Sequence, residues 1–189
     1  FVKKDASANV VLNTLYKYTE LQSSFAVNNI ALVNGRPMLL NLKDLIKHFV
    51  EHRHDVVVRR TQFDLKKAQE RMHIVKGLII AQQNIDEVVH IIRSSRSTDV
   101  AKQALQERFG LSEIQSAAIV EMRLRQLTGL EVEKLENEHA ELERQIAYFN
   151  DVLANVSMQL QIVKDELLEI KEKYGDERRS EIIYASEEF

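Results

Sequence analysis

The sequence predicts a mainly α-helical fold: a long antiparallel two-helix coiled coil with a small helical head at its tip, and a short β-hairpin near the N-terminus. Of the 189 residues, 29% are charged while only five are Gly and one is Pro, a composition typical of long helices with solvated faces. Two stretches repeat apolar residues three and four positions apart, the spacing of a helix that packs on a partner helix. Residues 84–130, between these stretches, carry the caps of short helices.

Residues 1–41 form the first expected region. Segment 8–17 has apolar side chains on one helical face, which predicts a short helix. Two apolar runs then flank Asn34-Gly35, a dipeptide that tolerates the positive φ of a tight hairpin turn. Pro37, just after the turn, suits an edge strand or the start of a strand.

Residues 42–83 form the outgoing arm. Asn41 is placed to cap this helix, with Asp44 three residues on as the reciprocal partner. The stretch contains no Pro and a single Gly, so it predicts one helix of roughly 62 Å at ~1.5 Å per residue. Its apolar seam recurs at spacings of three and four: Leu65, Ala68, Met72, Val75 and Ile79.

Residues 84–130 form the head. Asn84, Ser97 and Ser112 stand where N-caps are expected, and Gly110 suits a helix end in the left-handed conformation. These signals predict three short helices, at 85–93, 98–108 and 113–127. A core of this size is marginal in isolation, so the head should lean on the arms or on a second copy of itself.

Residues 131–175 form the returning arm, and 176–189 a C-terminal tail. The first piece, 131–154, has a seam with alternating spacings of four and three: Leu135, His139, Leu142, Ile146, Phe149 and Leu153. After a break at "ANVS", the piece 158–174 continues the pattern: Leu160, Val163, Leu167, Ile170 and Tyr174. Because the two arms have similar lengths, the returning arm can fold back along the outgoing arm as an antiparallel coiled coil.

Composition excludes several classes of function. The chain has no cysteine, which excludes disulfides, thiolate catalysis and cysteine metal sites. No run approaches the ~20 apolar residues of a membrane span, and no signal-peptide pattern occurs, so we expect a cytoplasmic protein. The net charge of -3 means that any nucleic-acid contact has to be local. The chain starts at Phe1 without a methionine, and we expect it to be part of a longer protein.

The stretch "HFVEH", from His48 to His52, has the H-x-x-E-H form of an inverted zinc-hydrolase motif. In such a motif the two histidines hold the metal and the glutamate, here Glu51, acts as the general base. A catalytic zinc also needs a third protein ligand and a pocket, and the sequence offers no matching motif elsewhere. A solvated helical face is the simpler interpretation.

Two further groups are candidate interaction sites. The run "HRHDVVVRR" concentrates positive charge near the start of the outgoing arm, and such a cluster can face DNA phosphates: His52, Arg53, Arg59 and Arg60. "MRLRQLTGLE" carries an apolar set at the turn from the head to the returning arm: Met122, Leu124, Leu127 and Leu130. This set is most simply the core of the head, and a contact between two copies of the chain is equally compatible with it.

Three stretches carry a family resemblance that extends over nearly the whole chain: "NVVLNTLYKYTELQSSFAVNNIALVNGRPMLLNLKDLIKHFVEHRHDVVVRRTQFDLKKAQERMHIVKGL", "RFGLSEIQSAAIVEMRLRQLTGLE" and "EIKEKYGDERRSEI". They resemble the A subunits of the bacterial type IIA DNA topoisomerases, the family of DNA gyrase and topoisomerase IV. The resemblance to gyrase is favoured, with topoisomerase IV as the close rival.

The resemblance implies that residues 1–41 end the tower region of these A subunits, and that the arms and head follow it. It implies that residues 84–130 pair with their two-fold mate as the exit gate, or C-gate, which opens to release the transported duplex. The implied partners are a second copy, double-stranded DNA and the B subunit. This segment is expected to hold no cofactor, since ATP and magnesium enter through the B subunit. The family's catalytic tyrosine motif does not occur here, so this chain alone is expected to cleave nothing.

Two alternatives of other classes stand beside this interpretation. One is a structural coiled-coil dimerisation module unrelated to DNA. The other is the zinc hydrolase that "HFVEH" suggests.

Overall fold

The computed structural model describes residues 1–183, with only the backbone described for Leu124, Leu127 and Leu130. The described residues contain seven α-helices, one 3-10 turn and one two-stranded antiparallel sheet. The predicted fold class, mainly α-helical with a short hairpin near the N-terminus, is therefore confirmed. The chain divides into two compact units, residues 1–49 and 50–189.

The first unit contains the helix α1 (Ala8–Tyr18) and the hairpin of β1 (Ile30–Val33) and β2 (Arg36–Leu39). The turn between the strands has positive φ at both central residues, 51° at Asn34 and 76° at Gly35. That combination matches the right-handed twist of the flanking strands, so the Asn-Gly signal predicted the turn correctly.

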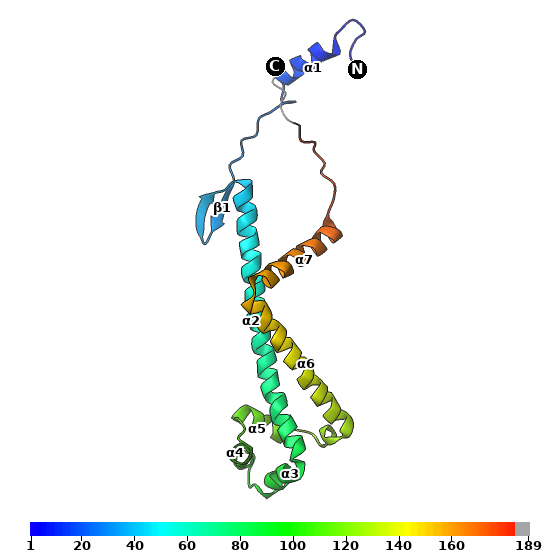
Figure 1. Ribbon diagram of the computed structural model, residues 1–189. Coiled ribbons are helices and arrows are strands. Elements are labelled where there is room, and N and C mark those ends of the chain that lie inside the picture. Colours follow the sequence, from blue (N-terminus) through cyan, green and yellow to red (C-terminus); the bar gives the residue numbers. More distant parts are fainter. Residues whose placement is uncertain (184–189) are drawn as a thin grey trace. The chain divides into compact units, whose positions relative to one another are not determined.

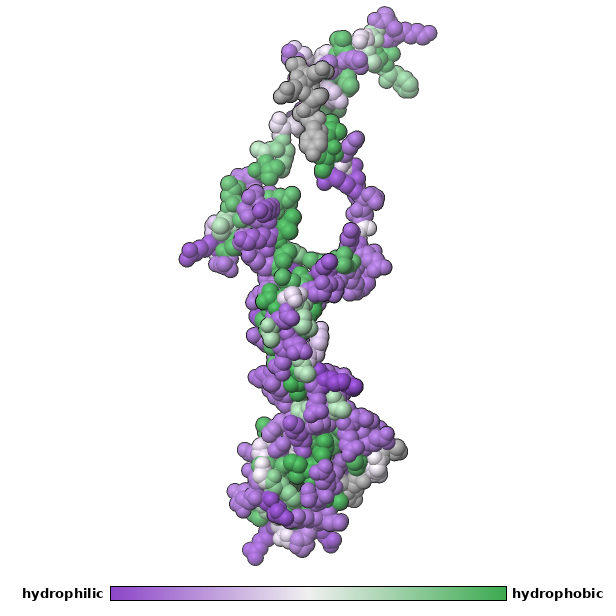
Figure 2. All heavy atoms as spheres, in the orientation of Figure 1, coloured by the Kyte–Doolittle hydropathy of each residue, from purple (hydrophilic) through white to green (hydrophobic). Residues whose placement is uncertain are grey.

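This unit has little apolar core of its own. Every residue of α1 is exposed, and the apolar side chains of the two strands lie largely on the surface. Leu40, directly after β2, is buried. Hydrophobic side chains consequently form part of the visible surface of both α1 and the hairpin (Figure 2).

The long helix α2 (Leu42–Gln83) is continuous over 42 residues, and the division between the units falls within it. Asn41 caps it as predicted, since Asn41 Oδ1 accepts a hydrogen bond of 2.8 Å from the backbone N–H of Asp44. None of the helices in residues 1–183 combines the length and the apolarity that crossing a bilayer requires.

The head of the second unit contains α3 (Ile85–Ser94), α4 (Thr98–Phe109), α5 (Glu113–Val120) and the 3-10 turn η1 (Leu124–Leu127). Its core is a cluster of buried apolar side chains: Ala81, Val88, Leu105, Leu111 and Ile119. Because Ala81 belongs to α2, the outgoing arm completes the core of the head.

Most of the predicted caps of the head are present. Ser97 Oγ accepts the backbone N–H that caps α4, Ser112 forms a reciprocal capping box, and Gly110 ends α4 with φ of 65°. Asn84 occupies the N-cap position of α3, but its Nδ2 donates to the carbonyl of Ile80 in the preceding helix. The predicted position of the N-cap is therefore correct. The predicted cap bond is absent, and the side chain of Asn84 instead bonds the end of α2.

The predicted helix 113–127 is broken. Helix α5 ends at Val120, and Arg123 has an extended backbone. The N–H of Arg123 donates to Gln126 Oε1 at 2.6 Å, which starts the 3-10 turn η1. A side chain that satisfies a backbone group locally competes with the helix at this point.

The returning arm consists of α6 (Gly129–Ala154) and α7 (Val156–Tyr174). Helix α6 runs back beside α2 (Figure 1), and the two share a core of buried side chains: Ala68, Met72, Val75 and Leu142. Partly buried apolar side chains pack against this core: Ile79, Leu135, Ile146 and Phe149. Leu65, which also belongs to the predicted seam, is partly buried.

The break in the returning arm is one residue wide. Asn155 alone leaves helical geometry (φ -129°, ψ 102°), and its Oδ1 accepts both the N–H and the Oγ–H of Ser157. Beyond it, the predicted seam is only partly buried: Val163 is 3% exposed and Leu167 is intermediate, whereas Leu160 and Ile170 are 43% and 53% exposed. Tyr174 is 78% exposed, so the seam prediction needs correction at Leu160, Ile170 and Tyr174.

Candidate functional site

The head has an apolar hollow of about 290 Å³ between α3 and the end of α5. Its lining is mainly aliphatic: Ile85, Val88, Val89, Ile92, Ile119, Val120 and Met122, with Arg93 and Arg123. Val88 and Ile119 belong to the buried core, while Val89 is 37% exposed. Hydrophobic surface lies among hydrophilic side chains over the head in Figure 2. Such a surface can bury apolar area against a partner.

A tight contact joins the head to the outgoing arm. Gln115, at the start of α5, donates from Nε2 to the carbonyl of His73 at 2.7 Å, and His73 Nε2 lies 2.6 Å from Ser112 Oγ. A Cβ placed on Gly77 would lie 2.8 Å from Gln115 Cβ, closer than side chains pack. Glycine at this position thus allows α5 to rest directly on the backbone of α2.

Near the head, a bidentate ion pair connects the two arms. Arg71 of α2 donates from Nε and Nη2 to the two carboxylate oxygens of Glu138 in α6, at 2.6 and 2.9 Å. The side-chain hydrogen bond from Arg71 lowers the pKa of Glu138 and raises the pKa of Arg71. Both residues line a polar hollow of about 260 Å³, so this pair is accessible to water.

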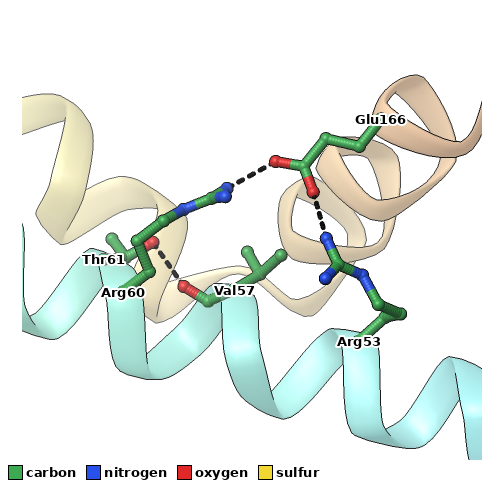
Figure 3. Close-up of polar contacts among 5 residues, drawn as sticks. All are labelled: Arg53, Val57, Arg60, Thr61 and Glu166. Carbon is green, nitrogen blue, oxygen red and sulfur yellow. Dashed lines mark hydrogen bonds and ion pairs between the residues drawn. The ribbon is translucent and has the colours of Figure 1, made fainter. Parts of the chain in front are cut away.

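At the other end of unit 2, two arginines of α2 converge on a single carboxylate of α7 (Figure 3). Arg53 Nη2 lies 2.7 Å from Glu166 Oε2, and Arg60 Nη2 lies 2.6 Å from Glu166 Oε1. The side chains of Arg53 and Glu166 are each 29% exposed, and that of Arg60 is 47% exposed. The hydrogen bond from Arg60, joined by the one from Arg53, lowers the pKa of Glu166. We call these three residues the arginine clamp.

A buried glutamine holds the break in the returning arm. Gln159 is 4% exposed, and its Nε2 donates to the carbonyls of Val152 (2.8 Å) and Leu153 (3.2 Å) in the last turn of α6. Its Oε1 lies 2.5 Å from His54 Nε2 of α2. Because an amide oxygen only accepts, His54 donates this bond. Gln159 therefore connects the end of α6, the start of α7 and the outgoing arm.

Comparison with known proteins identifies the family. Residues 1–168 match the sequence profile of the DNA gyrase/topoisomerase IV A subunit. The chain belongs to this family. It is 55% identical to the DNA gyrase A subunit of Staphylococcus epidermidis over 181 residues, and 55% identical to that of Fibrobacter succinogenes, in each case over 96% of this chain and 20% of the relative. The DNA gyrase A subunit of Ureaplasma parvum is 53% identical over 97% of this chain and 22% of the relative. The chain spans about a fifth of the length of these relatives.

In this member of the gyrase and topoisomerase IV family, three of the four predicted DNA-facing residues form ion pairs within the chain. Arg53 and Arg60 belong to the arginine clamp, and Arg59 forms an exposed ion pair of 2.8 Å with Asp55. His52 is exposed. Contact of these residues with DNA stays a prediction.

Of the four predicted dimer-contact residues, only Met122 has a described side chain. Met122 lines the apolar hollow of the head and also the polar hollow between the arms. The side chains of Leu124, Leu127 and Leu130 lie outside the described part of the chain. Sequence reasoning missed α3 as a lining element, although its apolar residues recur at helical spacing: Ile85, Val88, Val89 and Ile92.

The zinc interpretation gains no support from the geometry. Within the described residues, no three His, Asp or Glu side chains come together in a way that could hold a metal ion. His48, Glu51 and His52 therefore have no third ligand among those residues to complete a catalytic zinc site.

Proposed function

We propose that this chain is the coiled-coil and exit-gate segment of the A protein of a bacterial DNA gyrase. Two copies pair through their heads, and the heads part to release the transported duplex during ATP-dependent strand passage and supercoiling. The catalytic tyrosine and the ATP site belong to other parts of the cytoplasmic enzyme, which includes the B subunit. The segment itself acts as a gate and a lever.

The apolar hollow between α3 and α5 is the observation that carries this proposal. It lies on the head, and α3 contributes valine and isoleucine side chains to it, one of them, Val89, more than a third exposed. A two-fold dimer uses the same patch on both copies, so one such surface is sufficient for pairing. Family membership supports the choice of a second copy as the occupant.

The attachment of the head supports a lever. The head core includes Ala81 of α2, and Gln115 rests on the α2 backbone at Gly77. By contrast, residues 121–128, which lead from α5 to α6, contain only the short 3-10 turn η1. A movement of α2 is therefore transmitted to the head, and the irregular connection can absorb the change between head and returning arm.

The oligomeric state of surface variants tests the gate. We expect the native chain to be a dimer by light scattering after size exclusion at tens of micromolar, and Val89→Glu to be a monomer. The glutamate puts a charge into the apolar contact of both copies, at an exposed position where the fold of the monomer tolerates it. A native chain that is a monomer at this concentration would rule out head pairing.

Val100→Glu is the matched control. Val100 also lies on a helix of the head and is 48% exposed, but it is not among the residues that line the hollow. We expect this variant to remain a dimer with the same helical circular dichroism as Val89→Glu. Dissociation by both substitutions alike would show that the contact is not made through α3.

A further inference from the structure

The arginine clamp resembles a phosphate site in its chemistry. Arg53 and Arg60 lie seven residues apart, two turns along one face of α2, and they donate to different oxygens of the same Glu166 carboxylate. A phosphodiester presents two charged oxygens on one atom in a similar way, and arginine is suited to binding either group. In Figure 3 both guanidinium groups reach from α2 toward the one carboxylate.

We propose that Arg53 and Arg60 are a binding site for the phosphate backbone of double-stranded DNA, and that Glu166 occupies this site as an internal mimic of the phosphate. The site rests on the proposed function, because it requires a duplex to pass along the arms. While α7 lies on α2, the carboxylate holds both arginines. When α7 moves away, the arginines are released to the duplex.

The charges around the clamp fit this exchange. Asp55, the other carboxylate with a described bond to this basic run, pairs with Arg59 and not with the clamp arginines. Among the described ion pairs, Glu166 is the acidic partner of both Arg53 and Arg60. Its replacement by a phosphate conserves the pairing of both arginines, so the exchange leaves no guanidinium without a partner.

The construction of the returning arm allows α7 to move alone. The apolar core shared by the arms contains residues of α2 and α6 but none of α7. Helix α7 is separated from α6 by the single extended residue Asn155. Its described polar bonds to α2 are those of Gln159 and Glu166. Release of α7 would break these bonds and expose Val163, which is 3% exposed, but it would leave the buried cluster of Ala68, Met72, Val75 and Leu142 intact.

Binding of a fluorescent 30-base-pair duplex to the 189-residue chain tests the site. We expect Glu166→Gln to bind about threefold or more tightly than the native chain at low salt, since the competing carboxylate is removed. Each phosphate gained steepens the dependence of log K on log salt by about 0.9, so the slope should rise in magnitude by about 1 to 2.

Two controls separate the site from net charge. Glu169→Gln makes the same change of charge on α7, at a carboxylate that pairs with Lys173 of its own helix. We expect a smaller gain in affinity there and an unchanged salt slope. In the Arg53→Ala, Arg60→Ala background, Glu166→Gln should bring no gain, because its effect acts through these arginines.

Equal effects of Glu166→Gln and Glu169→Gln on DNA binding would overturn the proposed phosphate site. A full gain in affinity in the background without the two arginines would overturn it as well. So would the absence of any binding by Glu166→Gln. These outcomes can be told apart from those of the dimer test. If the chain pairs through Val89 and the two glutamate variants have equal effects, only the proposed phosphate site fails. If the chain is a monomer and shows the expected arginine-dependent gain, only the proposed gate fails.

Discussion

The two halves of the returning arm follow similar apolar spacings, yet they are held against α2 by different chemistry. Helix α6 contributes Leu142 to an apolar core with α2, and α7 bonds to α2 through Gln159 and Glu166. The difference begins in the last turn of α6, just before the break at Asn155. In the predicted register the seam continues at Leu153 and Leu160, but the buried positions are Val152 and Gln159, one residue earlier.

This contrast shows what a heptad-like pattern does and does not specify. Spacings of three and four identify a helix with an apolar stripe. They do not specify which stripe faces the partner near a break, since the buried position has already moved from Leu153 to Val152 in the last turn of α6. In α7 the stripe that faces α2 is mixed: Gln159, Val163 and Glu166. An apolar half fixes the arms together, and the mixed half is the one that we propose exchanges partners.

The largest expected effect compares two leucines of the predicted seam. Leu142→Ala should lower the free energy of unfolding by about 2 to 5 kcal/mol, because the side chain is 8% exposed within the α2–α6 core. Leu160→Ala should change it by no more than about 0.5 kcal/mol, since Leu160 is 43% exposed. Chemical denaturation measures both. Similar losses at the two positions would restore the predicted register and remove the contrast.

Much of the fold could be read from local signals. Asn41, Ser97, Ser112 and Gly110 act through hydrogen bonds or backbone conformations within a few residues of themselves, so the sequence contains their whole cause. The Asn34-Gly35 turn is of the same kind. The break after Val120 could not be predicted from apolar spacing, because the Gln126 side chain competes with the helix there and an apolar pattern contains no signal for that bond.

The candidate sites were less predictable. The arginine clamp joins residues 113 and 106 positions apart, and a basic run in the sequence does not reveal which carboxylate will neutralise it. Gln159 gave a weak signal, since it lies seven residues after Val152 and four before Val163, on one helical stripe. That stripe would have placed a polar residue in the interface. The alternative stripe through Leu160 is more apolar, and apolarity alone favoured it.

An intermediate effect tests the polar half at the break. Gln159→Ala should lower the free energy of unfolding by about 1 to 3 kcal/mol, because it removes a buried side chain that bonds two carbonyls of α6 and the imidazole of His54. Hydrogen exchange of the amides in 156–163 should accelerate more than exchange in α6. Gln161→Ala is the control, since the Gln161 side chain bonds only Asp165 on its own helix in the described contacts. A loss as large in Gln161→Ala would show that the buried bonds of Gln159 are not its cause.

The smallest expected effect is the pH dependence of the clamp. The hydrogen bonds from Arg60 and Arg53 lower the pKa of Glu166 from its usual value of 4.5. Its contribution to stability is therefore complete above the unfolded pKa and is lost as the pH falls through the lower folded pKa. At pH 7 we expect Glu166→Gln to be less stable than the native chain by about 1 kcal/mol, a modest value because Arg60 is nearly half exposed.

Denaturation curves recorded from pH 7 downward measure this effect, and the difference between the native chain and Glu166→Gln should vanish once Glu166 is protonated in the folded state. Glu169→Gln should differ from the native chain by no more than about 0.5 kcal/mol throughout, because the carboxylate of Glu169 is 63% exposed. A difference for Glu166→Gln that persists unchanged in acid would assign it to packing. In that case the packing of the Glu166 side chain, and not its charge, would hold α7 on α2.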